Sequence, residues 1–197
     1  TQRNGRRCSA AVAYLRPARQ RPNLVVRTHA LAARILLDGH RAVGVEYRSK
    51  GRTEIAEGGR VILAGGAINS PALLMLSGIG PQDVLSAAGV ELRHELPGVG
   101  KNLQDHLDIC TLVHCRKKIT YDHLNELWAG LRYLFDRKGP GSSNIAEAGG
   151  FLVSRHATDD RPDIQMHFVP AFLDDHGRNI LPGHGMTIHA CTLRPES

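Results

Sequence analysis

The chain has 197 residues, of which 42% are hydrophobic and 22% charged, so it is typical of globular proteins with one domain or two small ones. This composition excludes the disordered, collagen-like and disulfide-rich classes. Lys and Arg number 25 against 19 Asp and Glu, a formal net charge of +6, so a polyanionic partner has to be considered.

The positive charge is concentrated near the N-terminus, where six arginines fall within the first 21 residues: Arg3, Arg6, Arg7, Arg16, Arg19 and Arg21. They lack the series of interleaved aromatic residues that a base-stacking surface requires, so we expect no nucleic-acid partner. A binding module that uses this basic surface is the alternative function. The N-terminus has no apolar signal region, and the longest apolar or glycine run, residues 61–68, is shorter than the ~20 residues of a membrane helix. We therefore expect a soluble, cytoplasmic protein.

The first part of the chain predicts a helix that ends over residues 9–15, stopped by Pro17, and then a series of short strands. Residues 24–27, 30–37, 42–48 and 52–56 are rich in β-branched and apolar side chains, and the connectors LDGHR and RSKGR contain glycine. Such connectors predict hairpins and hence an antiparallel meander. Residues 60–64 (RVILA) are continuously apolar after the arginine, which predicts a strand covered on both faces.

A glycine turn and a short helix are predicted after that strand. Gly65 and Gly66 form the turn, Ser70 is the expected N-cap, Pro71 the first helical residue and Gly78 the left-handed end. Glycines at the carboxyl end of a buried strand let the backbone approach a nucleotide, although they equally permit a tight turn alone. No Gly-x-Gly-x-x-Gly or Gly-Lys-Ser/Thr loop is present.

Residues 97–105 (PGVGKNLQD) mark the predicted seam of the chain. Beyond it we expect a strand over residues 107–115, an amphipathic helix with a core face over residues 123–137, and a half-buried strand over residues 163–170. In that last strand Ile164, Met166 and Phe168 share one face, and Gln165 and His167 share the other. The cysteines and histidines show no metal-ligand spacing, so no metal site is expected.

A resemblance to a known family rests on the stretch GAINSPALLMLSGIGP, residues 66–81. This stretch resembles the second signature of the glucose-methanol-choline (GMC) oxidoreductases, flavoenzymes that oxidise alcohols with FAD. The resemblance continues through residues 87–106 and back through residues 23–47 in collinear order. Residues 139–194 are similar to the substrate domain of the branch that contains choline dehydrogenase and alcohol dehydrogenase (acceptor).

The resemblance implies a mixed α/β (α+β) fold, with residues 1–105 as the central part of an FAD-binding domain and residues 106–197 as the first part of an antiparallel-sheet substrate domain. The family's GxGxxG motif and its catalytic histidine with a His/Asn partner are not found here, so no catalytic residue is assigned. We expect the chain to be a central fragment that neither holds FAD tightly nor turns over alone. The whole protein would oxidise a primary alcohol, choline or an aliphatic or aromatic one, with a separate electron acceptor and possible peripheral association with a membrane.

The same resemblance assigns the candidate site residues. Ala32 would lie beside the adenine, or be only a meander residue. Ala64, Gly65 and Gly66 would line the FAD cleft near the ribose and diphosphate. Asn102 would bind near the flavin, or serve as a turn residue. For the substrate, Glu147 could face a cationic head group or make a structural hydrogen bond, and His167 could line the cavity or meet solvent.

Overall fold

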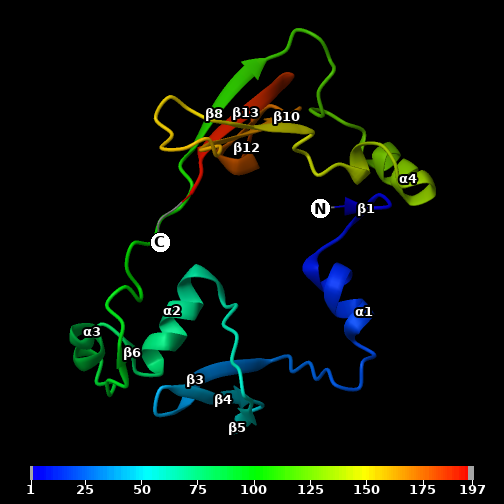
Figure 1. Ribbon diagram of the computed structural model, residues 1–197. Helices are drawn as coiled ribbons and strands as arrows, with labels where there is room; N and C mark the ends of the chain where they lie inside the picture. The colour runs from blue at the N-terminus through cyan, green and yellow to red at the C-terminus, as the bar shows by residue number, and fades with distance from the viewer. Residues whose placement is uncertain (1, 195–197) are drawn as a thin grey trace. The chain divides into compact units, whose positions relative to one another are not determined.

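The computed structural model describes residues 2–194, apart from the side chains of His176 and Ile180. Contacts divide the chain into two units, one of residues 25–104 and one of residues 2–24 and 105–194. The first 24 residues thus group with the second half of the chain. The model is a mixed α/β structure with antiparallel sheets, as predicted (Figure 1). The assignment of residues 1–105 and 106–197 to functional domains stays a prediction.

The unit of residues 25–104 contains the predicted meander, a three-stranded antiparallel sheet in the order β3-β4-β5. Its elements are β3 (Ala30–Asp38), β4 (Arg41–Ser49), β5 (Arg52–Glu57), α2 (Gly66–Leu76), β6 (Ile79–Gly80), α3 (Gln82–Ala87) and β7 (His94–Glu95). Lys50 and Gly51 both have positive φ, at 49° and 75°, as a two-residue hairpin turn requires. The strand expected at residues 24–27 is wrong, because that segment has no strand partner among the described residues.

The strand predicted at residues 60–64 is also wrong. The segment is not part of a sheet, and the Ile62 side chain is 81% exposed. A strand buried on both faces needs a neighbouring strand on each side to pair its backbone groups, and the described residues provide neither. An apolar run shows that a strand can be buried, but it does not supply the strands that would flank it.

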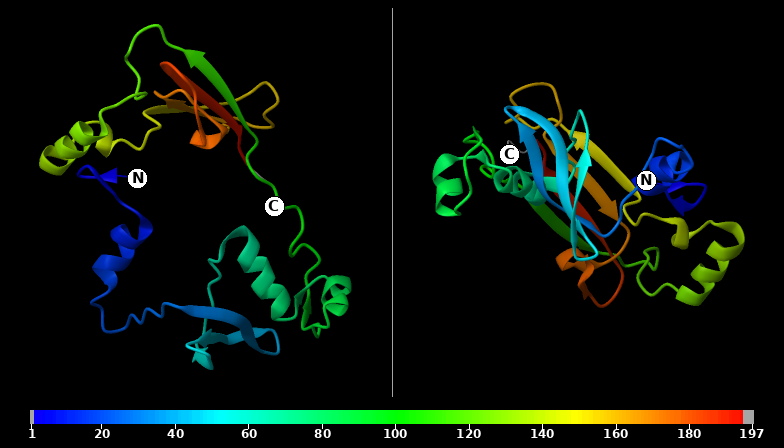
Figure 2. Two further views of the ribbon diagram at one scale, coloured as in Figure 1. Left: turned by 180° about the vertical axis from the view of Figure 1, so that it is seen from behind. Right: turned by 90° about the horizontal axis from the view of Figure 1, so that it is seen from below.

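Helix α2 begins earlier than predicted, at Gly66, with Gly65 at the N-cap position. Ser70 is therefore inside the helix rather than at its cap, and its hydroxyl accepts the Gly65 backbone N–H at 3.0 Å. Pro71 also lies inside the helix. The end of α2 is as predicted: Gly78 has φ +82°, and a Cβ there would lie 2.5 Å from the Glu91 carbonyl oxygen, so only glycine fits. Helix α2 packs against β3 (Figure 2).

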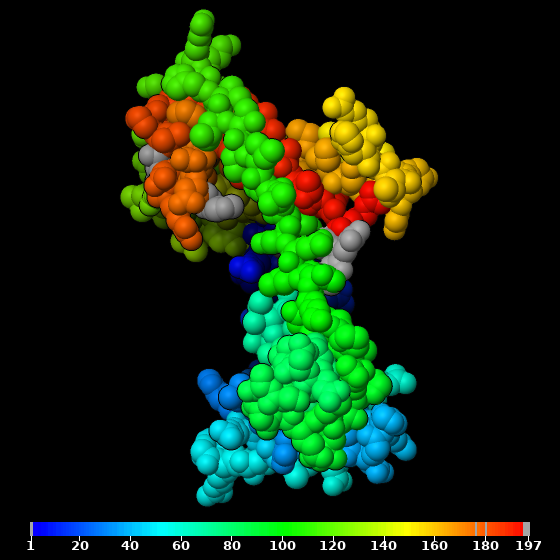
Figure 3. Space-filling view, turned by 90° about the vertical axis from the view of Figure 1, so that its left-hand side faces the viewer, coloured from blue at the N-terminus to red at the C-terminus, as the bar shows by residue number. Residues whose placement is uncertain are grey.

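The other unit is built on a four-stranded antiparallel sheet in the order β8-β13-β10-β9. Its elements are β1 (Gln2–Arg3), β2 (Arg6–Arg7), η1 (Ala11–Leu15), α1 (Arg16–Ala18), β8 (Asp108–His114), α4 (Glu126–Asp136), η2 (Pro140–Ser142), β9 (Ala148–Leu152), β10 (Ile164–Val169), β11 (Leu173–Asp174), η3 (Asp175–Gly177), β12 (Asn179–Ile180) and β13 (Gly185–Thr192). The strands predicted at residues 107–115 and 163–170 are thus confirmed as β8 and β10. Figure 3 shows β8 in green beside β13 in red.

Two helices of this unit differ from prediction. The N-terminal helix does not stop before Pro17, because Pro17 lies in the first turn of α1, where its missing N–H is not needed. Helix α4 begins at Glu126, since the Asn125 side chain caps it by accepting the Trp128 N–H at 2.9 Å. The apolar face of α4 is not a core face within the described residues, because Leu134 and Phe135 are 74% and 84% exposed.

Candidate functional site

A cavity of about 530 Å³ lies between β3, residues 61–65 and α2. Three of the five residues assigned to the cofactor, Ala32, Ala64 and Gly65, line it together. Ala32 and Gly65 are more than 30 positions apart in sequence. The chain passes through the meander β3-β4-β5 between them and returns, so that both residues line the same cavity. The remaining lining is mostly apolar: Ala30, Leu31, Val45, Val61, Ile62, Leu63, Asn69, Ser70, Ala72, Leu73 and Leu76.

The polar part of the lining comes from Asn69 and Ser70 of α2, and Gly66 is not among the lining residues. A Cβ at Gly65 would lie 3.2 Å from the Asn69 Cβ, so the first turn of the helix closes tightly on the glycine. Gly66 has φ +85° and nothing within 4 Å of its missing Cβ, so its backbone faces open space. The first N–H groups of a helix lack acceptors inside it and favour anions. The cavity is mostly apolar and lies beside the amino end of α2, so it suits a ligand with an apolar part and an anionic part.

Asn102 is not among the residues that line this cavity. It is exposed and has φ +55°, a left-handed conformation that asparagine tolerates in turns. Both interpretations of Asn102, a place near the flavin and a turn residue, stay predictions.

Glu147, assigned to the substrate, accepts two hydroxyl hydrogen bonds in the other unit. The Tyr121 hydroxyl donates to Glu147 Oε1 at 2.6 Å, and the Ser143 hydroxyl donates to the same oxygen. The bonds from Ser143 and Tyr121 lower the pKa of Glu147, and the bond to Glu147 raises the pKa of Tyr121. Glu147 is therefore an exposed carboxylate held in one position in its charged form. No spacing in the sequence pointed to Tyr121 or Ser143.

Tyr121 and Ser143 also line a cavity of about 460 Å³ within that unit. Asp122, which follows Tyr121 and also lines this cavity, joins three segments of the chain. Its Oδ1 accepts the Phe172 N–H at 2.9 Å, and its Oδ2 accepts the Gly185 N–H at 2.9 Å and the Thr120 hydroxyl at 2.7 Å. Burial alone would raise the pKa of Asp122, but these hydrogen bonds outweigh it and lower the pKa. Asp122 thus fixes the wall of the cavity and is a residue that sequence reasoning missed.

His167 lies in the middle of β10, opposite Gly149 on β9 and His189 on β13. Its ring is near Gly149, where a Cβ would lie 3.9 Å from His167 Nδ1. Within the described part of the chain, no hydrogen bond or ion pair joins His167 to Glu147. His167 lies on β10, whereas Glu147 lies one residue before β9 and donates its backbone N–H to the Phe168 carbonyl at 3.0 Å.

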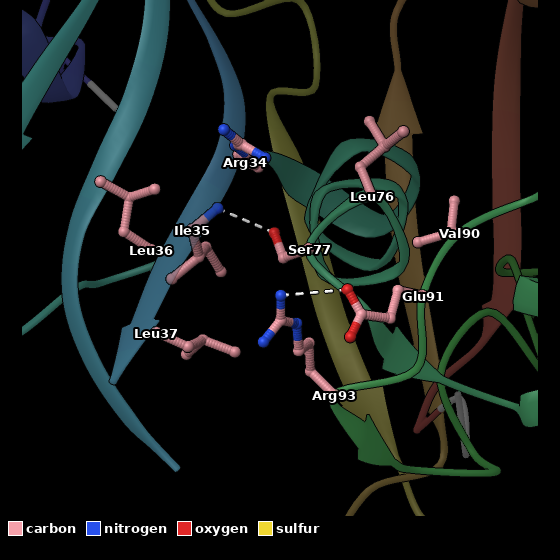
Figure 4. Close-up of a pocket in the computed structure, with 9 residues that line it drawn as sticks. All are labelled: Arg34, Ile35, Leu36, Leu37, Leu76, Ser77, Val90, Glu91 and Arg93. Atoms are coloured by element: carbon pink, nitrogen blue, oxygen red, sulfur yellow. Dashed lines mark hydrogen bonds and ion pairs between the residues drawn. The ribbon is translucent and has the colours of Figure 1, made fainter. Parts of the chain in front are cut away.

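A third cavity, of about 300 Å³, lies where the end of α2 meets β3 (Figure 4). Its charged groups are already paired: Arg34 with Glu46 at 2.7 Å and Arg93 with Glu91 at 3.1 Å. Ser77 is buried here and bridges the two elements, since its hydroxyl accepts the Ile35 N–H at 2.8 Å and donates to the Leu73 carbonyl at 2.6 Å. The Ser77 hydroxyl therefore holds β3 against α2 at this cavity.

Residues 1–108 match the family model described as GMC oxidoreductase. All of the chain is 44% identical to alcohol dehydrogenase (acceptor) of Pseudomonas putida and covers 37% of it. Over 98% of its length the chain is 44% identical to oxygen-dependent choline dehydrogenase of Serratia proteamaculans (strain 568) and covers 36% of it.

Among solved structures, pyridoxine 4-oxidase from Mesorbium loti is similar with a TM-score of 0.76 and 28% identity, over 100% of this chain and 36% of that one. The chain thus spans little more than a third of the length of these relatives.

Among residues 2–194, no helix combines the length and apolar character needed to cross a bilayer.

Proposed function

Because this chain belongs to the GMC oxidoreductase family, as its sequence predicted, we propose that it is the central part of a longer enzyme that oxidises a primary alcohol to the aldehyde with FAD. The whole-length similarity to an alcohol dehydrogenase (acceptor) and a choline dehydrogenase supports choline or an aliphatic or aromatic alcohol as substrate, with a separate electron acceptor. The same similarity favours an enzyme over a basic interaction module. A cytoplasmic location and peripheral membrane association stay predictions.

The observation that carries the proposal is the convergence of Ala32, Ala64 and Gly65 on one cavity. In this proposal Ala32 contacts the adenine through its backbone, and residues 64–66 lie along the ribose and diphosphate. The small residues fit this role, because side chains would occupy the space that the nucleotide needs. The amino end of α2 stabilises the negative charge of the diphosphate.

The bound FAD supplies the hydride acceptor, while the residues of this chain bind and orient. In the substrate unit, we propose that Glu147 attracts a cationic head group such as trimethylammonium. Its two hydroxyl hydrogen bonds keep it ionised and aimed in one direction, which supports this role. His167 would line the same substrate region. Asn102 would lie near the flavin because the segment that carries it passes there in the whole enzyme.

The experiment uses a longer polypeptide that carries the flanking coding sequence, with matched substitutions in the meander. Ala32→Phe fills the cavity, whereas Ala56→Phe adds the same side chain to an exposed position of β5 outside it. We expect the first variant to lose bound FAD and alcohol-dependent reduction of an acceptor dye, and the second to keep both. Equal FAD content in the two variants contradicts the proposed cofactor site.

The substrate role of Glu147 is tested by Glu147→Gln in the same longer protein. We expect the KM for choline to rise about two- to fivefold while the KM for its neutral tert-butyl isostere stays unchanged, because only choline loses a charge partner. A proportional rise for both substrates contradicts the charge role and indicates a positioning role through Tyr121 and Ser143. The purified 197-residue chain is expected to show neither a flavin spectrum nor turnover.

A further inference from the structure

Three side chains that can bind a metal ion meet on one face of the four-stranded sheet. Asp108 and Cys110 are two positions apart on β8, so they point to the same face, and His189 on β13 lies directly opposite Cys110. His189 Nδ1 is 2.8 Å from Asp108 Oδ2 and 3.1 Å from Cys110 Sγ, and Sγ is 3.9 Å from the same carboxylate oxygen. Nothing in the sequence spacing indicates this cluster, because β13 follows β8 by more than 70 residues.

The arrangement is not that of a nucleophilic relay. A Cys-His-Asp relay needs the thiol on one ring nitrogen and the carboxylate on the other. Here both Cys110 Sγ and Asp108 Oδ2 approach Nδ1 of His189. Instead, three atoms that can each donate an electron pair to a metal ion, namely Cys110 Sγ, His189 Nδ1 and Asp108 Oδ2, surround one point.

We propose that Asp108, Cys110 and His189 form a binding site for a Zn²⁺ ion, with water as the fourth ligand. Thiolate, imidazole and carboxylate are the ligands that zinc takes in proteins. Around a tetrahedral zinc ion such ligand atoms are about 3.3–3.6 Å apart. The three observed separations each differ from this range by roughly 0.5 Å or less, so small side-chain rotations complete the site.

The charges around the cluster favour a cation. Asp174 lies on β11, which contacts β8, so a neighbouring strand carries a second carboxylate. Within residues 2–194, the ion pair of Asp108 is with His189, and no lysine or arginine neutralises it. The Cys110 thiol releases its proton to solvent when the ion binds, and no oxidation is involved. The bound ion would fasten the start of β8 to β13, and this role is independent of the proposed enzyme activity.

The test titrates the metal-free 197-residue chain with Zn²⁺ by calorimetry and with Co²⁺ by absorption. We expect one ion per chain, a rise in Tm that a chelator reverses, and a near-ultraviolet sulfur-to-cobalt charge-transfer band. Cys110→Ser should abolish that band and weaken zinc binding at least tenfold, as should His189→Gln. Cys115→Ser and His156→Gln are matched controls outside the cluster and should bind like the parent chain.

Two results overturn the proposal. One is the absence of stoichiometric zinc binding by the folded parent chain. The other is zinc binding of parental strength in Cys110→Ser, which assigns the ion to other histidines of the chain. Circular dichroism of each metal-free variant separates lost ligands from lost folding. If Cys110→Ser does not fold, the Co²⁺ band decides. A thiolate band that persists when Cys8, Cys115 and Cys191 are each replaced by serine supports Cys110, and absence of the band in the parent chain refutes the proposal.

Discussion

Replacing Ser77 with alanine removes the hydroxyl that joins α2 to β3. The Ile35 N–H then loses its acceptor in a position where both residues are buried, at 7% and 8% exposure. The Leu73 carbonyl keeps the Ser77 backbone N–H as a donor at 3.1 Å, so only one group is left unpaired. An unsatisfied buried donor costs about 1–3 kcal/mol, and we expect a loss of about 1–2 kcal/mol in the free energy of opening β3.

Hydrogen exchange of the Ile35 amide measures this loss directly. A decrease of about 1–2 kcal/mol corresponds to exchange that is roughly 5–30 times faster. Ser86→Ala on the exposed surface of α3 is the matched control and should leave the Ile35 amide unchanged. The single tryptophan, Trp128, belongs to the other unit, so tryptophan fluorescence is not a substitute. Unchanged exchange at Ile35 in Ser77→Ala would refute the view that this hydroxyl fixes the cavity wall.

Three further predictions concern the other unit. The pKa of Asp122 in the folded chain is below its ordinary 3.8, so the stability that Asp122 contributes is complete above about pH 5 and is lost as pH falls through 3.8 toward the lower folded value. Asp122→Asn should flatten this part of the acid-unfolding curve, which Trp128 fluorescence follows. Glu147→Gln should lower the pKa of Tyr121 back toward 10.0, which ultraviolet titration of the phenol detects, and an unchanged titration contradicts the hydrogen bond. The Phe135 side chain is 84% exposed, so Phe135→Glu should change the stability of the unit by less than about 0.5 kcal/mol and reduce self-association in sedimentation experiments. Strong destabilisation would mean that the α4 face is buried.

The sequence predicted those parts of the fold that depend on local patterns. The meander followed from β-branched runs separated by glycine connectors, and the end of α2 followed from Gly78. The start of α2 was misplaced, because Ser70 is a good N-cap residue and nothing local shows that Gly65 takes that role. The segment 60–64 has the apolar character of a buried strand, but pairing depends on neighbours that are not among the described residues.

The candidate site shows the same division between local and distant information. Ala32, Ala64 and Gly65 could be assigned only through the family resemblance, since small residues carry no chemical signal of their own. The hydroxyl partners of Glu147 come from segments whose approach depends on the tertiary fold. Cys110 and His189 are paired by sheet register, which sequence spacing does not encode.

The central claim is that the cavity beside α2 binds the adenine nucleotide part of the cofactor. The most direct measurement is a titration of the isotopically labelled 197-residue chain with AMP, read from its backbone amide resonances. We expect weak, saturable shifts confined to residues 30–32 and 61–66, which disappear in Ala32→Phe and persist in Ala56→Phe. Shifts centred on the arginines of residues 3–21, or none at millimolar AMP, would contradict it.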